Sequence, residues 1–184
     1  LRRALYVTEL VMSFLTLTES RDLLDKCKFE LSLLTACKSN PECEYHAFNL
    51  VVGLNHLFEW AFKEGDFERK VSCFARFNPF QDEVSRDFKE VLSEFKEPCK
   101  VNPYQMTIRQ LCNGAKHFKK KANYQSKRNV TAVMGSLHMG SEVAAMGAFS
   151  HYSYLVDIDG TDVEILELLK VQVEAWSDFF ESNV

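Results

Sequence analysis

Three Asn-Pro dipeptides divide this chain and predict where helices begin: Asn40-Pro41, Asn78-Pro79 and Asn102-Pro103. An Asn side chain accepts hydrogen bonds from the free N–H groups at a helix start, and Pro is well suited to the first helical position. A helix-like segment follows each of the three pairs. A chain punctuated in this way is expected to fold mainly into helices.

Apolar residues recur at helical spacing through most of the first 120 residues. Ser20 is the predicted cap of one such segment, and Gly65 closes the longest one. The predicted helices cover residues 4–18, 21–38, 41–64, 67–75, 79–96 and 103–120. The helix over residues 41–64 is apolar nearly all round, which is typical of the buried centre of a bundle.

Two later segments have the composition of β-strands. Residues 130–134 and 148–158 are rich in β-branched and aromatic side chains, and three glycines lie between them. We expect two or three strands in a small antiparallel unit. Asp159-Gly160 then predicts a turn that leads into a final helix.

That final helix, over residues 161–183, has the clearest pattern in the chain. Thr161 and Glu164 form a capping-box pair at its expected start. Its large apolar side chains fall on one side of a helical wheel and predict a packed face: Ile165, Leu166, Leu168, Leu169, Val173, Trp176, Phe179 and Phe180.

These segments predict a mainly α protein, a helix bundle with a small antiparallel β unit before the C-terminal helix. We expect one domain over residues 1–184, with the bundle at 1–122 and the β excursion at about 128–158. The chain is 46% hydrophobic and has seven Gly and four Pro, which suits one packed core. No run of 18 apolar residues occurs, so no membrane span is expected; Glu9 interrupts the apolar start, which is interpreted as a core helix.

The six cysteines are interpreted as reduced residues of a cytoplasmic protein. They are Cys27, Cys37, Cys43, Cys73, Cys99 and Cys112. None forms a C-x-x-C pair, and most lie among apolar neighbours, where a free Cys behaves as a small hydrophobe. Cys37 and Cys43 flank a turn and are the pair whose proximity favours a bridge. The spacing of the six cysteines does not suit a zinc site. The Glu-x-x-His pairs of a di-metal helix bundle do not occur either, so no metal or cofactor is predicted.

The segment over residues 108–118 carries the strongest candidate chemistry. On a helix, Arg109, Asn113, Lys116 and His117 share an arc of about 100°. The basic tract Lys119, Lys120 and Lys121 follows. Arg and Lys offset phosphate charge, and His transfers protons near neutral pH, so the group is suited to binding and cleaving a phosphodiester. Because the net charge is −4, any contact with RNA is expected to be local.

A structural alternative uses the helix over residues 41–64. Asn49, His56 and Trp60 follow one line of that helix, with Gly53 between them. If Asn49 and His56 hydrogen-bond Asn113 and His117 across a helix–helix contact, the four residues form a buried Asn/His hydrogen-bond network. The chain would then be a non-catalytic interaction or scaffold domain. The remaining histidines, His46, His138 and His151, are scattered and are interpreted as incidental.

Two stretches carry a resemblance to known proteins: "YHAFNLVVGLNHLFEW" at residues 45–60 and "IRQLCNGAKHF" at residues 108–118. The chain resembles a group of uncharacterised bacterial and phage proteins that have an Asn…His-Leu-x-x-Trp helix and a later Asn-Gly-x-Lys-His helix. More distantly, its Arg…Asn…His helix resembles the HEPN superfamily of toxin–antitoxin and anti-phage systems. That resemblance implies metal-independent RNA binding or cleavage by Arg109, Asn113 and His117, at a site shared across a homodimer.

Overall fold

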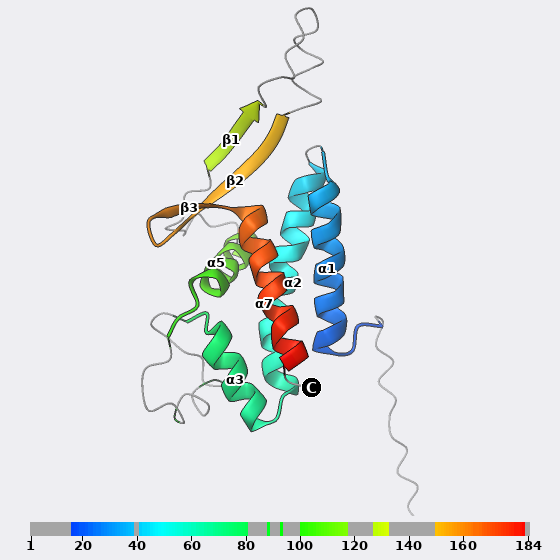
Figure 1. Cartoon of the computed structure of the whole chain (residues 1–184), viewed down its shortest axis with the longest axis vertical. Coiled ribbons are helices and arrows are strands. Elements are labelled where there is room, and N and C mark those ends of the chain that lie inside the picture. The colour runs from blue at the N-terminus through cyan, green and yellow to red at the C-terminus, as the bar shows by residue number, and fades with distance from the viewer. Residues whose placement is uncertain are drawn as a thin grey trace, which may run out of the picture.

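The computed structural model describes residues 16–38, 41–80, 88, 93, 100–117, 127–132 and 150–182. Within these residues, helices pack into a bundle and a small sheet extends from one end of it (Figure 1). The elements are α1 (Ser20–Ala36), α2 (Glu42–Glu64), α3 (Phe67–Phe77), α5 (Pro103–His117), β1 (Lys127–Ala132), β2 (Ser150–Ile158), β3 (Thr161–Glu164) and α7 (Ile165–Ser182). The predicted architecture, mainly α with an antiparallel β unit before the C-terminal helix, is confirmed.

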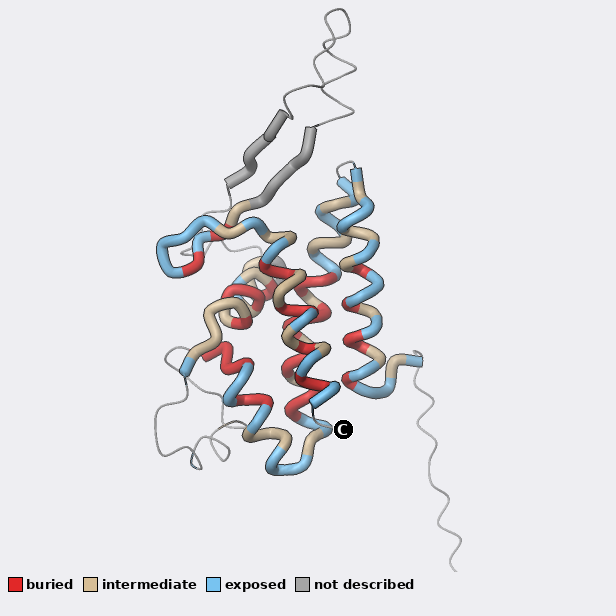
Figure 2. Tube along the Cα trace, in the orientation of Figure 1, coloured by how far each residue is buried: buried red, intermediate tan, exposed pale blue. Residues whose placement is uncertain are grey.

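Helix α2 is the centre of the bundle, because α1, α3, α5 and α7 all contact it. Buried side chains line its second half on several sides: Leu50, Val51, Leu54, Leu57, Phe58, Ala61 and Phe62. The prediction of a wholly buried helix is wrong for its first two turns, where Tyr45 and Phe48 are exposed. These turns extend along α1 beyond the other helices (Figure 2).

Two of the three Asn-Pro pairs begin helices as predicted. Pro41 is the N-cap of α2, and Pro103 is the first residue of α5. The Asn102 Oδ1 accepts a hydrogen bond of 2.9 Å from the backbone N–H of Gln105, as expected of a helix cap. The helix predicted at residues 79–96 lies outside the described residues apart from isolated positions.

The start of α1 differs from its prediction. Glu19 is the N-cap and forms a capping box with Asp22, whereas Ser20 lies inside the helix and its hydroxyl donates to Glu64 on α2. Residues 16–18, the described end of the helix predicted at 4–18, are not helical. The Asp22 carboxylate accepts the backbone N–H groups of Thr18 and Glu19, and these bonds hold the pKa of Asp22 below its ordinary value.

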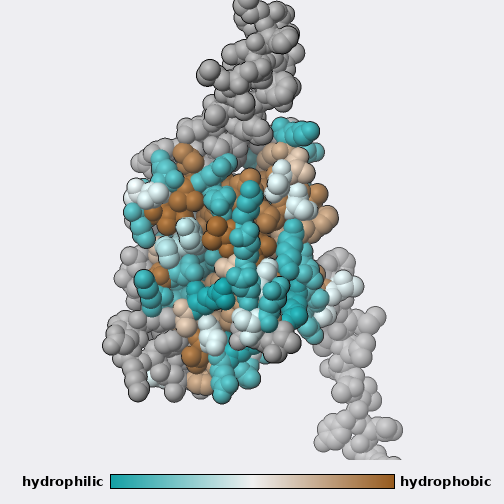
Figure 3. Space-filling model, viewed as in Figure 1, coloured by the Kyte–Doolittle hydropathy of each residue, from teal (hydrophilic) through white to brown (hydrophobic). Residues whose placement is uncertain are grey.

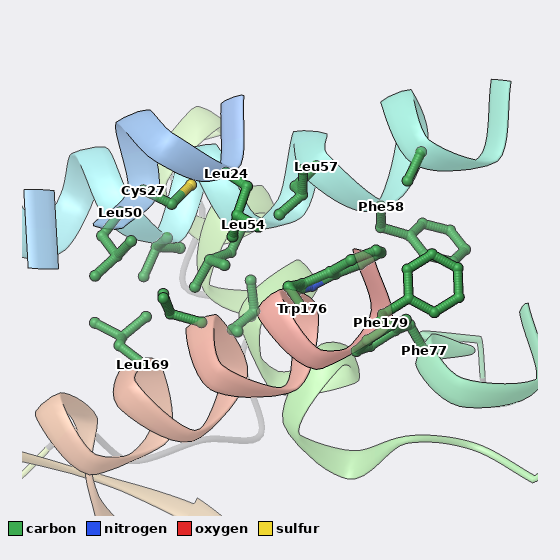
Figure 4. Close-up of a cluster of buried hydrophobic side chains, with 14 of the residues drawn as sticks. Leu24, Cys27, Leu50, Leu54, Leu57, Phe58, Phe77, Leu169, Trp176 and Phe179 are labelled. Carbon is green, nitrogen blue, oxygen red and sulfur yellow. The ribbon is translucent and has the colours of Figure 1, made fainter. Parts of the chain in front are cut away.

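Aromatic side chains fill the middle of the bundle. The Trp176 indole stacks on the Phe77 ring with centroids 3.7 Å apart and an interplanar angle of 8°. Phe179 meets both rings edge-on (Figure 4). Seven buried Phe residues belong to this packed core: Phe58, Phe62, Phe74, Phe77, Phe80, Phe179 and Phe180. On the face seen in Figure 3, hydrophobic side chains gather in the half nearest to the sheet.

Gly53 allows α1 and α2 to approach closely. A Cβ added at Gly53 would lie 2.7 Å from the Cys27 Sγ, far closer than two such atoms can pack. Cys27 itself is fully buried. The absence of a side chain at Gly53 thus makes room for the Cys27 side chain of α1.

The effect of adding a side chain at Gly53 on the free energy of unfolding is expected to depend on the residue at position 27. Gly53→Ala is expected to lower the free energy of unfolding by about 1 kcal/mol, because overpacking costs about 1–3 kcal/mol and exceeds the helix propensity gained by Ala. In a Cys27→Ala background, where the clashing sulfur is absent, Gly53→Ala is expected to raise the free energy of unfolding by about 0.5–1 kcal/mol through its higher helix propensity. Urea denaturation of the four proteins measures both values. Equal effects in the two backgrounds would contradict the proposed clash.

The sheet has the order β1-β2-β3, and both strand pairs are antiparallel. Asp159 and Gly160 have positive φ angles of 52° and 82° and make the turn between β2 and β3. The predicted turn is therefore correct, but the predicted capping box is wrong. Thr161 and Glu164 are the two ends of β3, where they pair with Ile158 and Leu155. Helix α7 begins after them, at Ile165.

No helix in the described ranges is long and apolar enough to span a membrane.

Candidate functional site

Helix α5 holds the residues predicted to act on a phosphodiester. Arg109 and Asn113 are half-buried, one turn apart. The Arg109 guanidinium lies over the Phe80 ring, 4.7 Å from its centroid. Lys116 and His117 belong to the same helix, but their side chains lie outside the described part of the structure, as do Lys119, Lys120 and Lys121.

Asn49 and His56, expected to face α5 in the alternative, have other partners. The Asn49 Nδ2 donates to the Glu30 Oε1 of α1 at 3.3 Å. The His56 Nδ1 lies 3.4 Å from the Glu59 Oε2, one turn further along α2. Both residues of α2 therefore make their described polar contacts away from Asn113.

A polar cluster does join two helices, but between α1 and α2. The buried Glu30 carboxylate accepts a hydrogen bond from the His46 Nδ1 at 2.9 Å. The other oxygen, Oε1, accepts hydrogen bonds from the Asn49 Nδ2 and, at 3.5 Å, from the Lys26 Nζ. We call these four residues, Lys26, Glu30, His46 and Asn49, the polar clasp. The interpretation of His46 as incidental is wrong, because its ring links the two helices.

The charge of Glu30 is stabilised in this site. Burial alone would raise the pKa of the carboxyl group, because it disfavours the charged form. The hydrogen bond from His46, the positive charge of Lys26 and the amide of Asn49 outweigh burial and hold the pKa of Glu30 below its ordinary value. Glu30 is therefore a charged anchor between the helices.

This depressed pKa makes part of the stability dependent on pH. A carboxyl group whose pKa is lower in the folded state stabilises the fold above its ordinary pKa of about 4.3, and that contribution disappears as the pH falls through the folded-state pKa. We expect Glu30→Gln to lower the free energy of unfolding at pH 7 by about 1–2 kcal/mol. The difference from the unmodified chain is expected to shrink below about pH 4.

Denaturation at a series of pH values measures this difference. Glu59→Gln is the matched control, since Glu59 forms the more exposed ion pair with His56 and should change stability by less than about 1 kcal/mol. If Glu30→Gln lowers the free energy of unfolding by the same amount from pH 7 to pH 3, the charge of the carboxylate does not stabilise the contact between the helices.

The tip of the α1–α2 hairpin is closed by a disulfide between Cys37 and Cys43, with 5.6 Å between their Cα atoms. The expectation that all cysteines are reduced is therefore wrong for this pair. The two residues lie at the facing ends of α1 and α2, so the turn brings their side chains together. Cys27, Cys73 and Cys112 are buried and belong to no disulfide, as predicted.

Exposed aromatic residues lie on the same two helices as the polar clasp. Residues three or four positions apart lie along one side of a helix. One such line on α1 contains Lys26, Glu30 and Leu33, and one on α2 contains Tyr45, Asn49 and Val52. The Glu30–Asn49 hydrogen bond joins the two lines into one surface. Phe29 neighbours Leu33 on α1, and Phe48 neighbours Tyr45 and Val52 on α2. We call this surface the outer face: Phe29, Leu33, Tyr45, Phe48 and Val52.

A local signal in the sequence points to the clasp. Glu30 is an isolated carboxylate within the apolar run from Phe29 to Leu34. A charge in such a run needs a partner when the helix packs, and the following helix supplies His46 and Asn49. The exposed state of Phe29, Tyr45 and Phe48 has no such signal, because aromatic residues at helical spacing are normally buried.

Among the described residues, no group of three or more His, Cys, Asp or Glu side chains is arranged to hold a metal ion. No family model, curated protein or solved structure matches the chain. Function must therefore be argued from the α5 residues and the outer face themselves.

Proposed function

We propose that the chain is a protein-interaction domain that binds a helical segment of a partner protein on the outer face of α1 and α2. One observation carries this proposal. Three aromatic side chains around the polar clasp are more than half exposed: Phe29 at 60%, Tyr45 at 61% and Phe48 at 51%. A contiguous group of exposed apolar side chains marks an interaction site far more often than scattered single ones do.

The chemistry of this surface is suited to binding. Aromatic residues are enriched in the centres of interfaces because they lose much exposed area and little conformational entropy on binding. Two antiparallel helices also present a groove into which a third amphipathic helix packs. The disulfide and the polar clasp hold α1 and α2 together, so little ordering is needed when a partner binds.

A photocrosslinking experiment tests the location of the interface. Benzophenone-bearing residues replace Phe48 on the outer face or Phe67 on α3, which is also exposed, at 45%. The proposal predicts one specific protein adduct from position 48 and none of the same mass from position 67. The same adducts from both positions, or adducts from position 67 alone, would place the interface elsewhere.

RNA binding through α5 is a second candidate function. Arg109 favours it, since its guanidinium is half-exposed and no described carboxylate lies within ion-pair distance of it. A guanidinium with no carboxylate partner among the described residues, one helical turn from Asn113, can bind a phosphate group. Arg109→Ala and His117→Ala should then each weaken binding of a single-stranded RNA oligonucleotide about tenfold in fluorescence anisotropy. Unchanged binding in both folded variants, or no binding by the unmodified chain, would remove this candidate.

A further inference from the structure

We propose that residues 4–15 of this chain bind the outer face as an amphipathic helix in the free protein and leave it when a partner helix binds. The release by a partner rests on the proposed interaction function, whereas the docking itself does not. Three observations carry the proposal: the side from which the chain enters α1, the pattern of residues 4–15, and the charges near the hairpin tip.

The chain enters α1 on the side of the outer face. The Asp22 carboxylate accepts hydrogen bonds from the backbone N–H groups of Thr18 and Glu19, at 2.8 Å and 3.0 Å. Phe29 and Leu33 follow Asp22 at spacings of seven and four residues, so all three lie on one side of α1. These bonds therefore place the chain, before α1 begins, at the base of the outer face.

Residues 4–15 are long enough to cover the exposed aromatic side chains. A helix rises about 1.5 Å per residue, so these twelve residues span about 18 Å. Leu33 lies eleven residues beyond Asp22, which is about 16 Å along α1. A helix that runs back along α1 from the base of the outer face therefore passes Phe29 and reaches Leu33.

The sequence of residues 4–15 has an apolar side suited to this surface. Apolar residues recur there at spacings that place them on one side of a helix: Ala4, Val7, Val11, Phe14 and Leu15. Glu9 and Ser13 fall on the opposite side. An amphipathic helix packs its apolar side against another apolar surface, and the outer face begins where this segment joins α1.

Charges near the hairpin tip favour the same arrangement. In a helix that runs back along α1, Arg2 and Arg3 come to the end of the bundle where α2 begins. Glu42 and Glu44 are exposed in the first turn of α2. The segment thus brings two positive charges to an end of the bundle that carries two negative ones, and their attraction favours docking.

The covalent connection makes even a weak contact effective. A binding segment joined by a short link acts at an effective concentration on the order of millimolar, so modest affinity is enough to cover the outer face. A partner helix then binds only the uncovered fraction of the molecules, and its apparent dissociation constant rises by the inverse of that fraction. Residues 4–15 therefore act as an internal competitor of the partner.

Crosslinking in the purified full chain, without a partner, tests the docking. The benzophenone-bearing residue at position 48 adjoins Asn49, whose bond to Glu30 brings it level with Phe29. After irradiation and tryptic digestion, we expect position 48 to be joined to the peptide of residues 4–21 of the same chain, and position 67 not to be. The absence of this link from position 48, equal yields from both positions, or a link formed only between two chains would overturn the proposal.

A matched pair of variants tests whether the apolar side makes the contact. Val11→Glu and Ser13→Glu each add one negative charge, but only Val11 lies on the apolar side. We expect Val11→Glu to lower the yield of the link at least about fivefold, because it would bury a charge, and Ser13→Glu to leave the yield within about twofold. Circular dichroism checks that both variants are folded. Equal yields from the two variants would overturn docking through this side.

The partner adduct from position 48 tests the release. Because Val11→Glu uncovers the outer face, we expect it to raise the yield of that adduct at least about twofold, with Ser13→Glu unchanged. An unchanged yield in Val11→Glu would overturn the competition and leave the interaction function standing. If no partner adduct forms while the link to residues 4–21 is present, the interaction function and the release are overturned and the docking stands.

Discussion

Replacing Trp176 with Ala is expected to lower the free energy of unfolding by about 3–5 kcal/mol. The indole is completely buried, stacks on Phe77 and meets Phe179 edge-on. Removing it leaves a cavity at the point where α3 and α7 pack together. A loss of this size is a large share of the stability of a domain of 184 residues.

Trp176→Phe separates packing from hydrogen bonding at the same position. The Trp176 Nε1 is buried, and the described residues offer it no hydrogen-bond partner. Phe keeps most of the ring and removes this unpaired donor, so we expect a loss of only about 1–2 kcal/mol. Urea denaturation followed by circular dichroism measures both variants, with the exposed Phe67→Ala as the control. Equal losses for Trp176→Ala and Phe67→Ala would contradict the proposed core.

Replacing Gln105 with Leu is expected to lower the free energy of unfolding by about 2–3 kcal/mol. Gln105 and Gln172 are buried between α2, α5 and α7, and the Gln172 Nε2 donates to the Gln105 Oε1 at 2.6 Å. The Gln105 Nε2 in turn donates to the backbone carbonyl of Leu54 at 3.4 Å. Leu at position 105 would leave the Gln172 amide buried without this acceptor.

The double variant Gln105→Leu/Gln172→Leu is expected to recover most of this loss. With both amides removed, no buried donor is left unpaired, and two Leu side chains of similar volume add apolar contact. Denaturation of the two single variants and the double variant gives the coupling free energy between the positions. If the double variant is as unstable as the sum of the single variants, the two amides do not act as a pair.

Much of the helical fold could be predicted because its signals are local. Gly65 ends α2, Asn102 caps α5, and the apolar side of α7 is visible in its own residues. Each of these features depends on neighbours three or four positions away. The same locality misled the prediction at Thr161 and Glu164, where a capping-box pattern was outweighed by pairing with β2. Strand pairing is decided by a partner segment that the local pattern does not include.

The candidate site was harder to predict because it joins residues of two helices. His46 and Glu30 are sixteen positions apart and meet only because α1 and α2 pack antiparallel. Asn49 was expected to hydrogen-bond Asn113 or His117 of α5, but its described partner is Glu30 of α1. The exposure of the first two turns of α2 was also hard to predict. The apolar pattern of the helix continues through Tyr45 and Phe48, but the neighbouring helices end before they could cover these turns.

Binding of a partner protein to the outer face is tested most directly by a titration. The partner segment identified by crosslinking is titrated by isothermal calorimetry against the oxidised full chain and against Tyr45→Ala, Phe48→Ala and Phe67→Ala variants. The account predicts that Tyr45→Ala and Phe48→Ala each raise the dissociation constant by about 10–100-fold, with Phe67→Ala unchanged. Unchanged affinity in both outer-face variants, with their folds intact by circular dichroism, would contradict it.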